Sequence, residues 1–154
     1  MKILEQSDAL TIVGLELRTS NAEAMQTIPP FWQRFQQEGV LDRLPGRLSP
    51  DVYAVYTHFA HAGRDNQGLY SLVIGAAVPP DAVVPPGLVR VVAPAGRRAV
   101  FTVEGGRPDK VGEAWAETWQ RSELPKSYVA DYERYRADGG IELWIGLHPA
   151  GVGA

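Results

Sequence analysis

The sequence predicts an α+β domain made of two β-α-β-β units about a pseudo-twofold axis, with an antiparallel-rich sheet, two helices on one face and a concave cleft on the other. The first observation is an internal repeat: Tyr70–Pro79 aligns with Ile141–Ala150, and the segments before each follow in the same order. The second is that strand-like runs alternate between apolar and polar residues. The third is one aromatic, helix-like segment in each half. A duplicated chain tends to place its copies about such an axis, with a cleft between them.

The length of 154 residues is most simply one domain, spanning residues 1–154. We place the first repeat at about residues 8–79, a proline-rich linker at 79–86 and the second repeat at about 87–148. The linker reads PPDAVVPP and should be extended and semi-stiff, because proline restricts the backbone. Neither repeat alone is expected to be stable, since a unit of about 75 residues buries too little surface.

The first half contains three predicted strands and one helical region. Leu10–Arg18 is rich in β-branched residues and alternates, which is typical of a strand. The helical region begins near Ser20 or Asn21, either of which can cap it, and Gly39 is a natural end. A loop, a strand, a turn-rich connection and a last strand follow, at Leu41–Pro50, Asp51–His61, Ala62–Gly68 and Leu69–Val78.

The second half repeats this plan. Leu88–Pro94 and Arg97–Val103 are strand-like on either side of a break, so they form one bulged strand or two short ones. Arg107–Ser122 is predicted to be a helix, and two further strands follow at Tyr128–Tyr135 and Ile141–Leu147. The turn between them contains Asp-Gly, which favours positive φ.

Composition and charge exclude several classes of protein. The chain has 15 Lys and Arg against 18 Asp and Glu, and its scattered basic residues lack the clustered face that direct nucleic-acid binding needs. The absence of cysteine excludes disulfides and thiolate chemistry. There is no signal peptide and no apolar run of about 18 residues, so we expect a cytoplasmic protein without membrane association. The three histidines lack metal-ligand spacing and no phosphate-binding glycine motif occurs, so no metal and no cofactor is expected.

Strand periodicity assigns side chains to faces of the predicted sheet. In IELWIGL the aliphatic residues point one way, toward the helix, whereas Glu142 and Trp144 point to the open face. In the preceding strand, placing Tyr132 under the helix puts Glu133 and Tyr135 on the open face as well. The two strands would then bring two acids and two aromatic rings to one surface.

The repeat is chemically asymmetric at this surface. Ala54 in the first copy corresponds to Glu133 in the second, with Tyr56 nearby on the same predicted face. Aromatic faces and a carboxylate partly removed from water both attract cations, so the pattern suits flat hydrophobic cations. The alternative is an ordinary solvated face on which Glu133 has no special role. The candidate ligand-binding residues are Glu133, Tyr135, Trp144, Tyr56, Glu142, Trp32 and His58; Trp115 and Trp119 are expected in the core.

Several short segments in a fixed order resemble the GyrI-like small-molecule-binding domains. They are the VGLELRT opening, the helix FWQRF, the strand end Tyr70–Gly75, the VPPG linker and the YERY strand followed by IELWIGL. Together they cover about residues 8 to 148. Such domains are the effector-binding parts of some AraC-type and MerR-type transcription activators, and stand-alone members include gyrase-inhibitory proteins and an integron-cassette multidrug-binding protein.

The resemblance implies a ligand cleft near the pseudo-twofold axis. It implies lipophilic cationic ligands, held by aromatic residues and by an acid on the strand that YERY matches, which is Glu133. Family regulators carry a separate DNA-binding module, for which this chain has no room, so the first hypothesis is a stand-alone binder of small molecules. A second is a hydrolase of cyclopropane-type genotoxins with Glu133 as general base. A third is a module that binds a protein partner, such as a transcription factor or a topoisomerase.

Overall fold

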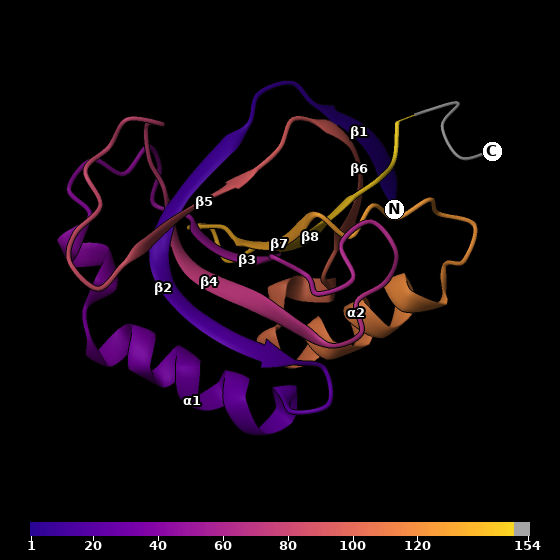
Figure 1. Ribbon diagram of the computed structural model, residues 1–154, viewed down its shortest axis with the longest axis horizontal. Helices are drawn as coiled ribbons and strands as arrows, with labels where there is room; N and C mark the ends of the chain where they lie inside the picture. Colours follow the sequence, from indigo (N-terminus) through magenta and orange to yellow (C-terminus); the bar gives the residue numbers. More distant parts are fainter. Residues whose placement is uncertain (150–154) are drawn as a thin grey trace.

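The computed structural model describes residues 1–149, in which an antiparallel sheet of eight strands carries two α-helices on one face (Figure 1). Short 3-10 helices lie in the connections, at Val40–Arg43, Glu104–Gly106 and Pro108–Lys110. The predicted α+β class is therefore confirmed. The strands are β1 (Lys2–Gln6), β2 (Leu10–Ser20), β3 (Val52–Thr57), β4 (Leu69–Ala77), β5 (Val89–Ala93), β6 (Gly96–Thr102), β7 (Ala130–Tyr135) and β8 (Ile141–Gly146), and the helices are α1 (Ala24–Gln37) and α2 (Val111–Gln120).

The strand order reflects the duplication directly. The order is β1-β6-β8-β7-β3-β4-β2-β5, and every neighbouring pair is antiparallel. In the repeat, β1, β2, β3 and β4 are equivalent to β5, β6, β7 and β8. If each strand is replaced by its equivalent and the order is then reversed, the same strand order results. β3 and β7 meet at the centre, where Ala54 lies opposite Glu133. Since these two residues are also equivalent in the repeat, the pseudo-twofold axis passes through this pair.

Each half has the order β-β-α-β-β, which is one strand more than the first half was predicted to have. The additional strand, β1, is a mostly exposed edge strand that pairs with β6, so it has little of the buried alternation that marks a strand in a sequence. In the second half, the run expected as one bulged strand or two short ones is the two strands β5 and β6.

The strand register corrects the alignment of the repeat by two residues. Tyr56 pairs with Leu72 in the first half, and its equivalent Tyr135 pairs with Ile141 in the second. Leu72, and not Tyr70, is therefore the structural equivalent of Ile141. Because side chains alternate with a period of two, this shift leaves the residues of β4 and β8 on their predicted faces.

Both helices pack on the same face of the sheet through their apolar side chains. Phe31 and Phe35 of α1 are buried against aliphatic residues of β2 and β4, and Trp115 of α2 packs against β6 and β8. α1 runs continuously through Pro29 and Pro30. Among residues 1–149, no helix is long and apolar enough to span a membrane.

The face of the sheet away from the helices is not open. The sheet curls so that β1 and β5, its two edge strands, arch over that face (Figure 1). Gln6 of β1 joins the edges, because its Nε2 donates a hydrogen bond to the Ala93 carbonyl of β5 at 3.1 Å. Tyr53, Val55 and Tyr132 are buried in a second core beneath this arch. The face opposite the helices is therefore concave, as predicted, but it is not an open cleft, because the curled sheet covers it with its own edges.

Candidate functional site

The carboxylate of Glu133 lies buried at the centre of the molecule, on the helix face of β7. Its Oε2 accepts hydrogen bonds from the Tyr56 hydroxyl at 2.8 Å and from Trp115 Nε1 at 2.6 Å. Its Oε1 accepts a hydrogen bond from the Tyr135 hydroxyl at 2.5 Å. Tyr56 comes from β3 and Trp115 from α2, so three elements converge on one acid. We call these four residues the Glu133 cluster.

Charge in the Glu133 cluster is stabilised by hydrogen bonds rather than by a cation. Glu133 is only 2% exposed, and within residues 1–149 no Lys, Arg or His nitrogen lies within 4.0 Å of its carboxylate. Burial raises the pKa of Glu133 above its ordinary value, and the three hydrogen bonds oppose this effect. The pKa values of Tyr56 and Tyr135 are raised by burial and by the charge of Glu133, which keeps both hydroxyls protonated as donors.

A pocket of about 160 Å³ lies beside the Glu133 cluster, between the two helices and the sheet. Tyr56 and Trp115 belong both to its wall and to the cluster, so Glu133 lies directly behind the wall. Ile28 of α1 and Ile145 of β8 add apolar surface. We call this the aromatic pocket, after the six aromatic residues that line it: Tyr56, Phe59, Tyr70, Trp115, Trp119 and Tyr128.

One wall of the aromatic pocket carries a buried acid and a lysine. Asp131 precedes Glu133 by two residues and therefore shares its face; it is 6% exposed, and its Oδ1 accepts a hydrogen bond from the Gly146 amide at 2.7 Å. Burial is the main cause that raises the pKa of Asp131 to about 6. Lys126 Nζ donates to the Arg121 carbonyl at 2.7 Å, and burial lowers its pKa. The pocket thus combines an aromatic lining with a titratable charged wall.

The structure brings four of the predicted site residues together, but on the helix face. Glu133, Tyr56 and Tyr135 are hydrogen-bonded partners, and the Trp32 ring of α1 lies 5.1 Å from the Tyr135 ring in an edge contact. The prediction that Tyr132 packs under the helix is wrong. Glu133 pairs with Leu143 of the helix face, and this register turns Tyr132 to the opposite face.

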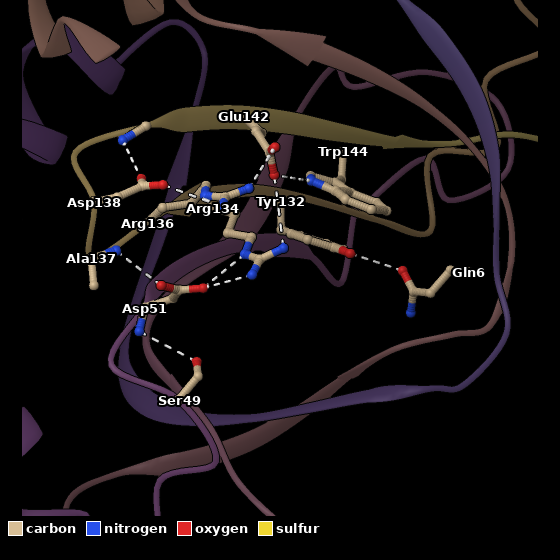
Figure 2. Close-up of polar contacts among 11 residues, drawn as sticks. Gln6, Ser49, Asp51, Tyr132, Arg134, Arg136, Ala137, Asp138, Glu142 and Trp144 are labelled. Carbon is tan, nitrogen blue, oxygen red and sulfur yellow. Dashed lines mark hydrogen bonds and ion pairs between the residues drawn. The ribbon is translucent and has the colours of Figure 1, made fainter.

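Glu142 and Trp144 lie on the face opposite the Glu133 cluster. Figure 2 shows them beside Tyr132 and Arg134. Trp144 stacks on Tyr132 with the ring centroids 5.7 Å apart, and its Nε1 donates to Glu142 Oε1 at 3.0 Å. Glu142 also lies 3.9 Å from Arg134 Nη1 and 3.6 Å from Arg136 Nη1, so its charge is locally balanced. The sheet therefore separates this acid from the Glu133 cluster.

His58 also lies apart from the Glu133 cluster. It follows β3 directly, its side chain is exposed, and its φ of 51° is left-handed. Its backbone carbonyl accepts a hydrogen bond from Arg18 Nη1 at 2.5 Å. The residue therefore shapes the chain at the end of β3, and its imidazole does not reach the Glu133 carboxylate.

Trp115 is the residue of the cluster that sequence reasoning missed. Its spacing from Trp119 predicts a helix and core packing; the contacts of Trp115 with β6 and β8 confirm this for Trp115, whereas Trp119 is 50% exposed and lies outside the core. The indole N–H is the missed feature, since a buried tryptophan needs an acceptor for it. The search for an acceptor among the few acids on strands would have led to Glu133. Within the described residues, no group of three or more His, Asp and Glu side chains is arranged to hold a metal.

A symmetric antiparallel sheet with two helices on one face, and an aromatic pocket beside a buried acid, define an effector-binding domain of the GyrI-like class. The family model described as Cass2, integron-associated effector binding protein, matches residues 3–147. The chain belongs to this family, which is one of the GyrI-like families, and is therefore an effector-binding protein. The resemblance found in the sequence is confirmed.

Solved structures share the fold at low sequence identity. An integron cassette protein from the mobile metagenome of Vibrio cholerae matches with a TM-score of 0.74 and 21% identity, over 96% of this chain and 95% of that chain. SAV2435 bound to tetraphenylphosphonium matches with a TM-score of 0.75 and 21% identity, over 96% and 93%. A putative bacterial transcription regulation protein from Staphylococcus aureus matches with a TM-score of 0.73 and 20% identity, over 94% and 95%. A search of curated proteins found no match.

Proposed function

We propose that the protein binds lipophilic aromatic cations in the aromatic pocket, with Glu133 as their buried counter-charge. The observation that carries this proposal is that Glu133 is buried and accepts three hydrogen bonds from neutral donors, with no cationic side chain within ion-pair distance among residues 1–149. A buried charge is costly unless it is paired. A bound cation would supply the missing partner.

The lining of the pocket supports a ligand with an aromatic body. Tyr56 and Trp115 expose their rings to the pocket while their polar hydrogens point to Glu133, so the negative charge polarises the surface that a ligand would touch. Ring faces attract cations within about 6 Å of their centroids, by about 0.5–2 kcal/mol each. The tetraphenylphosphonium complex of SAV2435 supports the same ligand class, on the basis of a shared fold.

A pair of isosteric ions tests the charge requirement. Tetraphenylphosphonium and tetraphenylborate have nearly the same shape and opposite charge, and binding of each can be followed by quenching of tryptophan fluorescence. We expect saturable binding of the cation and at least tenfold weaker binding of the anion. Affinity for the cation should fall as the pH is lowered through the raised pKa of Glu133, because protonation removes the counter-charge.

Glu133→Gln keeps the size of the side chain and removes its charge, so it should weaken cation binding by about 1–3 kcal/mol, or roughly 5- to 150-fold. Glu142→Gln is the matched control, since this acid lies on the other face and is paired with arginines. It should bind the cation as the wild type does. Equal affinity of wild type and Glu133→Gln would contradict the role of Glu133.

The same variants separate binding from hydrolysis of a strained electrophile. The hydrolase hypothesis is supported by the raised pKa of Glu133, because a carboxylate with a raised pKa can act as a general base. Three hydrogen bonds from the cluster, however, already occupy most of the acceptor sites of this buried carboxylate, which leaves one site on Oε1 for a water. Turnover of a cyclopropane-containing electrophile that is lost in Glu133→Gln would favour the hydrolase; saturable binding without product favours the binder.

A further inference from the structure

A second pocket, of about 360 Å³, lies where the turn between β5 and β6 meets the end of β8. It shares no lining residue with the aromatic pocket, although residues 126–131 run between the two. We call it the Arg98 pocket, after the arginine of β6 in its wall. Arg97, Ser127, Gly146 and His148 line it together with Arg98.

Arg98 is a buried guanidinium without a carboxylate in direct contact. It is 3% exposed, and within residues 1–149 its Nη1 and Nη2 donate hydrogen bonds only to the carbonyls of Ala130 at 2.7 Å and Pro94 at 3.1 Å, while its Nε has no partner. The Tyr132 ring lies 5.0 Å from the guanidinium carbon, and the carboxylate of Asp131 acts on the charge from beyond the 4.0 Å of an ion pair. An anion in contact with the guanidinium would therefore lower the cost of burying its charge.

Gly146 lets two polar side chains approach each other in the lining of the pocket. A Cβ added at this position would lie 2.8 Å from Ser127 Oγ, 3.2 Å from the Ala130 carbonyl oxygen and 3.4 Å from Arg98 Nη1, so only a residue without a side chain fits between them. The Ser127 hydroxyl and the Arg98 guanidinium therefore lie close together beside the pocket. Groups of these two kinds are donors that recognise an oxyanion in proteins.

The rest of the lining selects among oxyanions. Val129, Leu147 and Pro94 are apolar and suit the body of an organic molecule. Glu5 also lines the pocket and opposes the charges of Arg97 and Arg98, so the lining favours one negative charge over two. We propose that the Arg98 pocket binds the carboxylate of a small organic acid, with Arg98 and Ser127 as donors.

Benzoate and benzamide test this site, because they share a ring and differ in charge. Two backbone amides report on it by nitrogen-15 NMR: Gly146, whose N–H bonds Asp131, and Ser127, whose N–H bonds the Gly146 carbonyl at 2.9 Å. Benzoate should shift both resonances saturably, and benzamide should leave them unchanged. Inorganic phosphate should bind at least several-fold more weakly than benzoate. Equal shifts with benzoate and benzamide, or no saturable shift with benzoate, would overturn the proposal.

Two variants probe the two proposed donors separately. Arg98→Met removes the charge and should weaken benzoate binding about tenfold or more, and Ser127→Ala removes the hydroxyl and should weaken it about fivefold. Arg64→Gln removes one exposed positive charge outside both pockets and should bind benzoate like the wild type. If Arg98→Met does not fold, Ser127→Ala decides, since it removes a proposed donor without adding an atom to the pocket. Unchanged benzoate affinity in a folded variant of either kind would refute the site.

Discussion

Glu133 experiences two opposing effects at the scale of a single residue. Removal from water raises its pKa, whereas the hydrogen bonds from Tyr135, Trp115 and Tyr56 lower it. Each donor therefore helps keep the acid ionised, and the balance among them sets the charge that a ligand in the aromatic pocket would meet. The aromatic residues thus contribute more than apolar surface.

Trp115→Phe should raise the pKa of Glu133 further. The substitution keeps an aromatic ring in the wall and deletes one donor, and a hydrogen bond to a charged group is worth about 1.5–3 kcal/mol, or roughly one to two pKa units. A carbon-13 NMR titration of the side-chain carboxylate measures the change. Trp119→Phe, at a half-exposed position without a hydrogen bond to Glu133, is the control. A pKa unaltered by Trp115→Phe would mean that the indole does not stabilise the charge.

The raised pKa of Asp131 predicts that the protein becomes less stable as the pH rises from about 4 to about 6. Its pKa rises from 3.8 to about 6 in the folded protein, so its contribution to stability is present below pH 3.8 and lost as the pH rises toward 6. The shift corresponds to about 3 kcal/mol.

Asp131→Asn can still accept the Gly146 hydrogen bond and should remove this part of the decrease, as measured by urea unfolding at pH 4 to 7. Asp65→Asn, which removes an exposed acid with a lowered pKa, should retain the decrease. An unaltered profile in Asp131→Asn would show that burial does not perturb this acid.

At the scale of elements, β2 and β4 approach each other closely at two facing glycines. Gly14 pairs with Gly75, and a Cβ added at Gly14 would lie 2.1 Å from the Ile74 carbonyl oxygen. A Cβ added at Gly75 would lie 2.0 Å from the Val13 carbonyl oxygen. The rigid backbone of the neighbouring strand cannot move aside as a side chain can. The glycines therefore permit a strand contact on which the first half of the sheet depends.

Gly75→Ala should lower the free energy of unfolding by more than about 2 kcal/mol, because it forces the two strands apart. Denaturation in urea, followed by circular dichroism, measures the loss. Gly112→Ala is the control: nothing lies within 4 Å of the added carbon, and it should leave stability unchanged or raise it by up to about 1 kcal/mol. A Gly75→Ala protein as stable as the wild type would show that the strands can separate at no cost.

At the scale of the whole molecule, each half needs the other to complete the single sheet and its buried cores. The central pair β3 and β7 comes from different halves, and β1 of the first half pairs with β6 of the second. Tyr56 and Glu133, from opposite halves, share a hydrogen bond within the buried cluster. Separation of the halves would expose the centre of the sheet and break the Glu133 cluster.

The fragment of residues 1–86 should therefore not fold alone, and the same holds for residues 87–154. Proton–nitrogen NMR spectra of each fragment should show poor dispersion, and mixing the two at equal concentration should restore the dispersed spectrum of the whole chain if they reassemble. A well-dispersed spectrum of either fragment by itself would contradict this expectation.

Much of this architecture can be predicted from local patterns in the sequence. The repeat, the two helices and every strand except β1 follow from periodicity and turn residues, although the sequence leaves open whether β5 and β6 are one strand or two. The alternation along YERY already separates Glu133 from Tyr132. A period of two cannot say which of these residues faces the helices, and a shift of one residue exchanges the two faces. The pairing of Glu133 with Leu143 makes that choice, and it is a contact between strands rather than a property of either one.

The chain's own patterns thus account for the class of fold, for the duplication and for an acid among aromatic residues near the pseudo-twofold axis. They do not account for the burial of Glu133, for its hydrogen bond from the Trp115 indole of α2 or for the covering of the opposite face by β1 and β5. These features arise when segments far apart in the sequence meet, as Trp115 meets Glu133 and Gln6 meets Ala93. The burial, hydrogen bonds and pKa of Glu133 all depend on these long-range contacts. The low dielectric that strengthens electrostatic interactions forms only after the chain has packed around the charge.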